Sequence, residues 1–147
     1  LSVTIRLHQL SQPAPPVDRG VLMMYNTGDA TDIRCHKPIL DLHDAAPYLP
    51  YLKDYKLSLN AAYPVFTWRI LFRGGQFVGF VHYDGEYLIL ASDSIVIRQP
   101  ALFEIISAVN AIGNRRPEAN DEIILFDLNN NNINRLNYDE YERIFNN

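Results

Sequence analysis

The sequence predicts an α/β fold, organised as the C-terminal half of a (β/α)8 barrel-like fold with a small antiparallel β insertion. Apolar and polar side chains alternate over residues 1–10, which is typical of a strand. Residues 21–26 are apolar on both faces until the last position, as expected of a parallel strand covered on both sides. A third strand at 60–68 follows a short predicted helix, and this strand–helix–strand spacing favours parallel pairing.

The first strand has one apolar and one polar face. Val3 and Ile5 lie on the apolar face, while Arg6 and His8 lie on the other. A surface strand would direct the polar face to solvent, whereas a barrel strand would direct it toward an interior site. Because the strand is already under way at the first residue, we expect residues 1–147 to be either a single domain or a half-barrel fragment.

The next segments alternate between loop, strand and helix. Residues 11–20 are rich in proline and cannot form a helix. After the strand at 21–26, the sequence predicts a short helix over Asp44–Tyr55 with Asp44 near its N-cap. Pro50 should delay the start of this helix or kink it.

Residues 70–98 predict the small β insertion. Ile70–Phe80 reads as a hairpin whose turn, Arg73–Gln76, contains two glycines that can adopt positive φ angles. Residues 86–91 and 94–98 predict a second antiparallel pair.

The last third returns to helices and one strand. Residues 101–112 form an amphipathic helix with Gly113 at its C-terminal end. The sequence then predicts a core strand over Glu122–Asp127 and a terminal helix over Tyr138–Phe145.

Composition excludes several classes of function. The chain is 48% hydrophobic and 20% charged with a net charge of −4, and its Lys and Arg residues are scattered, so we expect no nucleic-acid partner. No apolar run reaches the ~18–20 residues that span a bilayer, so we expect no transmembrane segment in this chain. Cys35 is the only cysteine, which excludes an internal disulfide and a Cys-rich zinc site.

Four segments taken in order are similar to a known family. They resemble the C-terminal half of uncharacterised bacterial exported, lipoprotein-like proteins with a glycoside-hydrolase-like (β/α)8 barrel. The resemblance implies the barrel fold and an exported protein, periplasmic or anchored to the outer membrane, and it carries no catalytic residues. The segments are Thr4-Ile-Arg-Leu-His-Gln9, Pro15-Pro-Val-Asp-Arg-Gly-Val-Leu-Met-Met-Tyr-Asn-Thr-Gly-Asp29, Ala62-Tyr-Pro-Val-Phe-Thr-Trp68 and Leu71-Phe-Arg-Gly-Gly-Gln-Phe77.

Polar and aromatic side chains gather at the predicted C-terminal ends of the strands, where barrel proteins hold their sites. Aromatic rings there could offer flat apolar faces to a pyranose, and the polar groups could bind its hydroxyls. The alternative is that these side chains only make hydrogen bonds and packing contacts within the fold. The candidate ligand-binding residues are Arg6, His8, Gln9, Tyr25, Asn26, Asp29, Trp68 and Asp127.

The chain lacks a clear catalytic pair. Glycoside hydrolysis normally uses two carboxylates about 5–10 Å apart. Asp29 and Asp127 are the strand-end carboxylates, and each is equally well explained as a turn or capping residue. Arg6 and His8 could orient an anion, or Arg6 could pair with Asp29 or another acid. The catalytic residues are therefore unknown.

Three functions remain open at this point. The chain could bind or process a glycan as a glycoside-hydrolase-like protein, it could be a non-catalytic cell-envelope protein that kept the barrel, or it could be a self-contained α+β binding domain. An exposed parallel edge would favour a homodimer or association with an N-terminal half.

We expect no metal and no cofactor. The run from Asp127 to Asn134 superficially resembles a calcium loop, but Asn132 stands where a glycine is needed and Tyr138 where a bidentate Glu is needed. The histidines show no metal-ligand spacing.

Overall fold

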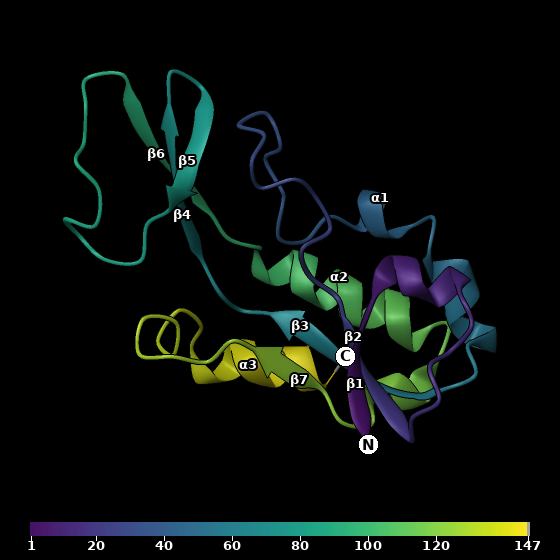
Figure 1. The fold of residues 1–147 in the computed structure, drawn as a ribbon. Helices are drawn as coiled ribbons and strands as arrows, with labels where there is room; N and C mark the ends of the chain where they lie inside the picture. The colour runs from purple at the N-terminus through teal and green to yellow at the C-terminus, as the bar shows by residue number, and fades with distance from the viewer. Residues whose placement is uncertain (147) are drawn as a thin grey trace.

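The computed structural model describes residues 1–146 and contains two separate sheets (Figure 1). One is a four-stranded parallel sheet in the order β1-β2-β3-β7, and the other is a three-stranded antiparallel sheet in the order β5-β4-β6. The strands are β1 (Ser2–Arg6), β2 (Arg19–Met23), β3 (Ser58–Pro64), β4 (Trp68–Arg73), β5 (Gln76–Phe80), β6 (Asp93–Arg98) and β7 (Ile124–Phe126). The α-helices are α1 (Leu42–Ala45), α2 (Leu102–Gly113) and α3 (Tyr138–Phe145), and the 3₁₀ turns are η1 (Leu7–Ser11), η2 (Leu49–Asp54) and η3 (Pro117–Asn120).

The predicted fold class is wrong: the chain is a small mixed α/β domain and not half of a (β/α)8 barrel. A barrel follows each strand with a helix. Here β1 is followed by η1 and a loop with several prolines, which cannot form a helix, and β3 runs almost directly into the antiparallel sheet. The parallel direction of β1, β2 and β3 is confirmed.

The three long parallel strands start together, and β3 runs two residues past the ends of β1 and β2. Arg6 pairs with Met23, which pairs in turn with Ala62, while β7 joins β3 only over Ala62–Pro64. This common register brings the carboxyl ends of β1 and β2 to the same point on one edge of the sheet.

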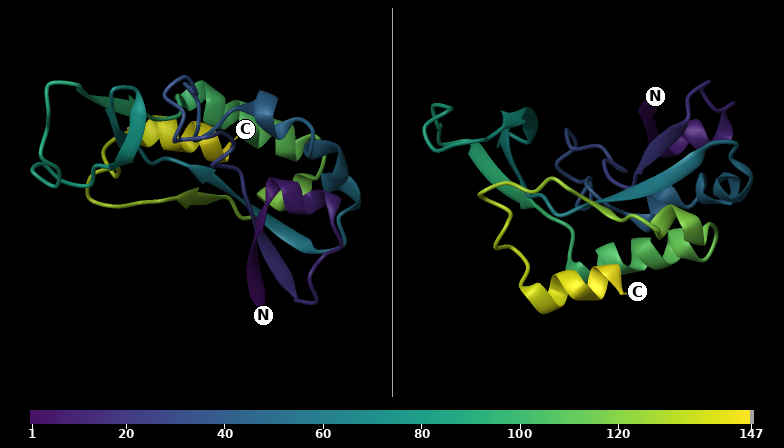
Figure 2. Two further views of the ribbon diagram at one scale, coloured as in Figure 1. Left: turned by 45° about the horizontal axis from the view of Figure 1, so that its top comes forward. Right: turned by 90° about the horizontal axis from the view of Figure 1, so that it is seen from below.

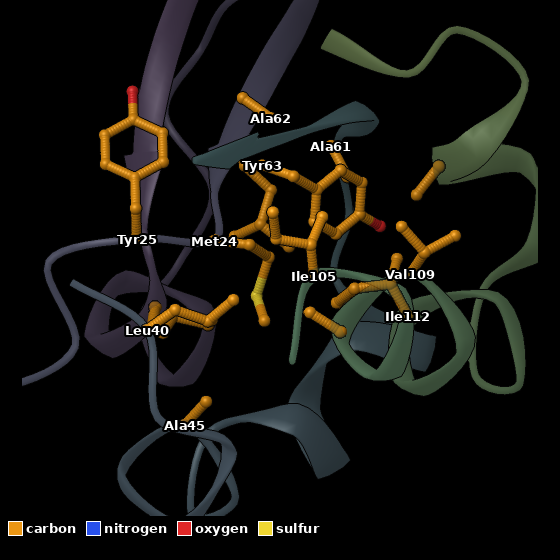
Figure 3. Packing of buried hydrophobic residues seen from close by; sticks show 14 of the residues in the cluster. Met24, Tyr25, Leu40, Ala45, Ala61, Ala62, Tyr63, Ile105, Val109 and Ile112 are labelled. Atoms are coloured by element: carbon orange, nitrogen blue, oxygen red, sulfur yellow. The ribbon is translucent and has the colours of Figure 1, made fainter. Parts of the chain in front are cut away.

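One face of the parallel sheet packs on α2. Ile105, Val109 and Ile112 are fully buried on the helix stripe and lie against Met24 and Tyr63 (Figure 3). α2 forms where the sequence predicted it. Its N-terminus is capped by the Glu104 side chain, which accepts a hydrogen bond from the Ala101 amide at 2.8 Å.

The helix α3 lies alongside α2 (Figure 2, right). Its predicted bounds, Tyr138–Phe145, are confirmed, and Asn137 caps its first turn by accepting from the Glu140 amide at 3.0 Å. Among residues 1–146, no helix combines the length and the apolar character that crossing a membrane requires.

The other face of the parallel sheet is more open. Thr4 and Arg6 are exposed on β1, and Ile124 and Phe126 remain 37% and 46% exposed on β7. The alternation predicted for the first strand is therefore real, but its polar face looks toward solvent and not into a closed barrel.

The antiparallel sheet contains the predicted hairpin. β4 and β5 pair antiparallel, and Gly74 and Gly75 in their turn have φ angles of 56° and 79°, which favour glycine. The predicted pairing of 86–91 with 94–98 is wrong, because β6 pairs with β4 instead. Residues 86–91 are held as a loop, in part by the Arg73 guanidinium, which donates to the Leu88 carbonyl at 3.2 Å.

The helix predicted over Asp44–Tyr55 is split. Asp41, and not Asp44, caps α1, since its Oδ1 accepts from the His43 amide at 2.9 Å. Pro50 lies inside the 3₁₀ turn η2, so the interruption expected from this proline is present. The first strand also ends earlier than predicted, at Arg6, because the chain turns into η1.

Arg116 joins η3 to the segment that leads into β3. Its guanidinium donates to the carbonyls of Tyr55 at 3.0 Å and Leu57 at 2.8 Å. We expect Arg116→Ala to lower the free energy of unfolding by about 2–4 kcal/mol, because the substitution removes charged hydrogen bonds and leaves their acceptors unpaired. Chemical denaturation measures the change. Arg115→Ala is the control, since Arg115 is exposed and should cost less than about 0.5 kcal/mol; equal losses in the two variants would contradict this role.

Tyr63 makes the free energy of unfolding depend on pH in the alkaline range. Burial raises the pKa of this phenol, whose hydroxyl lies 2.5 Å from Asn120 Oδ1. The unfolded chain loses this proton near pH 10, while the folded chain keeps it. The free energy of unfolding is therefore unaffected by the titration of Tyr63 below about pH 10, and above it falls by up to about 1.4 kcal/mol per pH unit. We expect Tyr63→Phe to have a shallower decline in urea-unfolding stability between pH 10 and 12. An unchanged slope would show that Tyr63 does not titrate in this way.

Candidate functional site

A cavity of about 170 Å³ opens where β1 and β2 end. This is the edge of a parallel sheet at which ligands commonly bind, because the loops that follow the strands meet there. The cavity is lined by Arg6, Leu7, His8, Met23, Tyr25, Asn26, Thr27, Asp44 and Tyr48.

The β1 side of the cavity is shaped by the turn into η1. Gln9 Oε1 accepts a hydrogen bond from the Arg6 amide at 2.8 Å, which fixes the turn immediately after the strand. Arg6 and His8 line the cavity on this side and are exposed, whereas Gln9 is not among the lining residues. Gln9 therefore positions the turn beside the cavity, and its ligand-binding role stays a prediction.

Tyr25 and Asn26 follow β2. The Tyr25 ring is buried and points away from the Met24 side of the strand (Figure 3), and it stacks on Phe126 with ring centroids 5.1 Å apart and planes 5° apart. Burial raises the pKa of the Tyr25 hydroxyl, which therefore stays protonated at neutral pH. Phe66 meets the same ring edge-on at 5.8 Å, so two aromatic neighbours fix its orientation.

Asn26 has a left-handed backbone, with φ of 57°. Asparagine tolerates this region better than most residues do. The conformation turns the chain sharply after β2 and places the exposed Asn26 side chain on the cavity wall.

The wall opposite the strand ends comes from α1 and the residues around it. Thr27 Oγ1 accepts from the Asp41 amide at 2.8 Å and so ties the end of β2 to the N-cap of α1. This contact brings Asp44 and Tyr48 to the cavity. Neither residue was a predicted site residue; Asp44 was identified only as a helix cap, and nothing local in the sequence marks Tyr48.

Besides Gln9, three further predicted site residues lie outside the cavity lining. Asp29 closes a turn with Thr31, whose amide and hydroxyl donate to Oδ1 at 2.9 and 2.6 Å, and these bonds lower the pKa of the Asp29 carboxyl. Asp127 Oδ1 accepts from the Asn132 amide side chain at 3.0 Å. Trp68 packs between Phe66 and Phe80.

The remaining polar side chains are available to a ligand. Within residues 1–146, the side chains of Arg6, His8 and Asn26 make no hydrogen bond to another part of the chain. The expected pair between Arg6 and Asp29 does not form in this range. No group of three or more His, Cys, Asp or Glu residues in the described part of the chain is arranged to hold a metal ion.

Comparison with known proteins gives no relatives. The sequence matches no protein-family model, and no curated protein or solved structure is similar to it.

The backbone at Asn26 gives a direct test of how the cavity wall is built. We expect Asn26→Val to lower the free energy of unfolding by about 1–2 kcal/mol, because a β-branched residue fits the left-handed region poorly. Asn26→Gly should be neutral or stabilising, since glycine adopts this region freely. Thermal unfolding of both variants measures the difference. If valine and glycine were equally tolerated, the left-handed conformation at Asn26 would be disproved.

Proposed function

We propose that the cavity at the carboxyl ends of β1 and β2 binds one unit of a neutral sugar. The observation that carries this proposal is the mixture of unused hydrogen-bonding groups on one small cavity. Arg6 only donates, Asp44 in its ionised form only accepts, and Asn26 does both. Sugar hydroxyls are donors and acceptors at once, so this lining suits them.

The charges on the cavity favour a neutral ligand. Arg6 and Asp44 contribute one formal charge of each sign. An anionic ligand would be attracted by Arg6 and repelled by Asp44, and a cationic ligand would be repelled by Arg6 and attracted by Asp44. A polyhydroxylated ligand gains from both, since a hydrogen bond to a charged partner is worth more than one between neutral groups.

The size of the cavity limits the ligand. At about 170 Å³ it is smaller than the ~300–1,000 Å³ typical of drug-sized sites. One sugar ring is the largest portion of a saccharide that we expect inside it. Tyr25 and Tyr48 supply apolar surface for the carbon atoms of such a ring.

The proposal is for binding and not for hydrolysis. Asp44 is the only carboxylate among the cavity-lining residues, and hydrolysis by the usual route needs two carboxylates flanking the bond. The candidates Asp29 and Asp127 are both engaged in their own turns.

A panel of monosaccharides tests the proposal. We expect glucose, galactose, mannose or N-acetylglucosamine to shift the backbone amide resonances of His8 and Asn26 in NMR titrations, while glucuronate should bind more weakly than its neutral counterpart. Arg6→Ala should weaken the best sugar about 10- to 100-fold, because it removes a charged hydrogen-bond donor.

Arg19→Ala is the matched control. Arg19 is also exposed on the parallel sheet, but it lies at the opposite end of β2, outside the cavity. It should leave sugar affinity unchanged. The proposal fails if no sugar of the panel perturbs the cavity resonances, or if both arginine variants weaken binding equally.

A further inference from the structure

The edge strand β6 presents aliphatic side chains to solvent, and no strand of residues 1–146 pairs with its outer side. β6 lies at one edge of the antiparallel sheet and pairs only with β4 among the strands formed by residues 1–146. Ile95 and Ile97 are 41% and 63% exposed. At the other edge strand, β5, the side chains of Phe77 and Phe80 are half-buried, so the two edges are not equivalent.

Nothing in β6 protects this edge. Edge strands commonly carry a lysine, a proline or an outward charge that prevents another strand from pairing. The charges of β6 lie at its two ends and are both used within the chain. Asp93 accepts from Arg73 at 2.8 Å, and Arg98 donates to the Ile33 carbonyl at 3.0 Å. The centre, Ile95-Val-Ile97, is free of charge and rich in β-branched residues that favour strands.

We propose that β6 pairs antiparallel with β6 of a second copy of this chain, forming a six-stranded sheet across a two-fold axis. The unpaired N–H and C=O groups of the edge require an extended strand as their partner. A two-fold axis also requires a surface that complements itself, and the sequence of β6 meets this requirement.

The pleat of the strand selects the register. Ile95 and Ile97 lie on one face, together with Asp93, while Ser94, Val96 and Arg98 lie on the other. Residues that oppose one another across an antiparallel pair point to the same face. Only registers that set odd positions against odd ones and even against even ones keep each face continuous.

Among these registers, the one centred on Val96 is the most favourable. It places Ile95 opposite Ile97 of the second copy on one face, and Val96 opposite Val96 on the other. Arg98 then lies opposite Ser94, so no like charges meet. A shift that centres on Ile95 would instead place Asp93 against Ile97, which gives the carboxylate no polar partner in the second copy.

The loop before β6 also exposes apolar side chains. Leu88 and Ile89 are 81% and 53% exposed, and the loop is anchored next to the start of β6, where the Leu90 amide donates to Asp93 Oδ2 at 2.8 Å. The antiparallel sheet stands at one end of the molecule, apart from α2 and the parallel sheet (Figure 2). A second copy could therefore approach without contacting the sugar cavity at β1 and β2.

Sedimentation equilibrium over a range of concentrations tests the dimer. We expect the wild-type mass to rise with concentration toward twice that of the chain. Ile97→Lys should raise the dissociation constant at least ten-fold, because it sets a charge against Ile95 of the second copy. Tyr51→Lys is the control, since Tyr51 is 50% exposed in η2, which lies at the opposite end of the molecule from the antiparallel sheet (Figure 1), and it should dimerise as the wild type does.

Cross-linking tests the register. In a Cys35→Ser background, Val96→Cys should cross-link two copies on oxidation, because opposed residues have Cβ atoms about 4.5–5.5 Å apart. Ile95→Cys alone should cross-link poorly, since its partner is Ile97, whereas the double variant Ile95→Cys with Ile97→Cys should cross-link well. The proposal is overturned if the wild type stays monomeric at every concentration, if Ile97→Lys dimerises unchanged, or if Ile95→Cys cross-links better than Val96→Cys.

Discussion

The shared register of β1, β2 and β3 is the constraint on which the rest of the structure depends. Because Arg6, Met23 and Ala62 are neighbours across the sheet, the chain leaves two strands at the same edge and must turn there. The two turns differ: one is a 3₁₀ turn held by Gln9, and the other is a left-handed residue, Asn26. The chain runs in different directions after these two turns, and the cavity lies between the two segments. A one-residue slip would send Arg6 to the buried face and remove it from the site.

The sequence predicted those elements whose periodicity is decided locally. α2 and α3 follow the 3.6-residue repeat, and the hairpin follows from its Gly-Gly turn. The sequence did not predict the partner of β6, because residues 86–91 have a strand-like composition, whereas the tertiary contact from Arg73 to Leu88 helps to hold them in a loop. The barrel was wrong for a related reason: strand direction can be read from spacing, whereas closure depends on helices that the proline-rich connection cannot form.

The predicted site residues divide in a similar way between those that line the cavity and those that do not. Arg6, His8, Tyr25 and Asn26 line the cavity because their positions at strand ends are visible in the sequence. Asp29 and Asp127 share that position, but their carboxylates are taken up by neighbouring Thr31 and Asn132. Asp44 and Tyr48 arrive from a distant segment through the contact between Thr27 and Asp41, which no local pattern reveals.

The parallel sheet carries the proposed sugar cavity, and the antiparallel sheet carries the proposed dimer interface. Trp68 begins β4 and packs on Phe66, just after β3, at 5.3 Å, while Phe66 also touches Tyr25 of the cavity wall. This aromatic row fixes the end of the parallel sheet next to the start of the antiparallel one without filling the cavity. Because Trp68 pairs with Arg98 across β4 and β6, the aromatic contacts connect the wall of the cavity to the strand that pairs with β6.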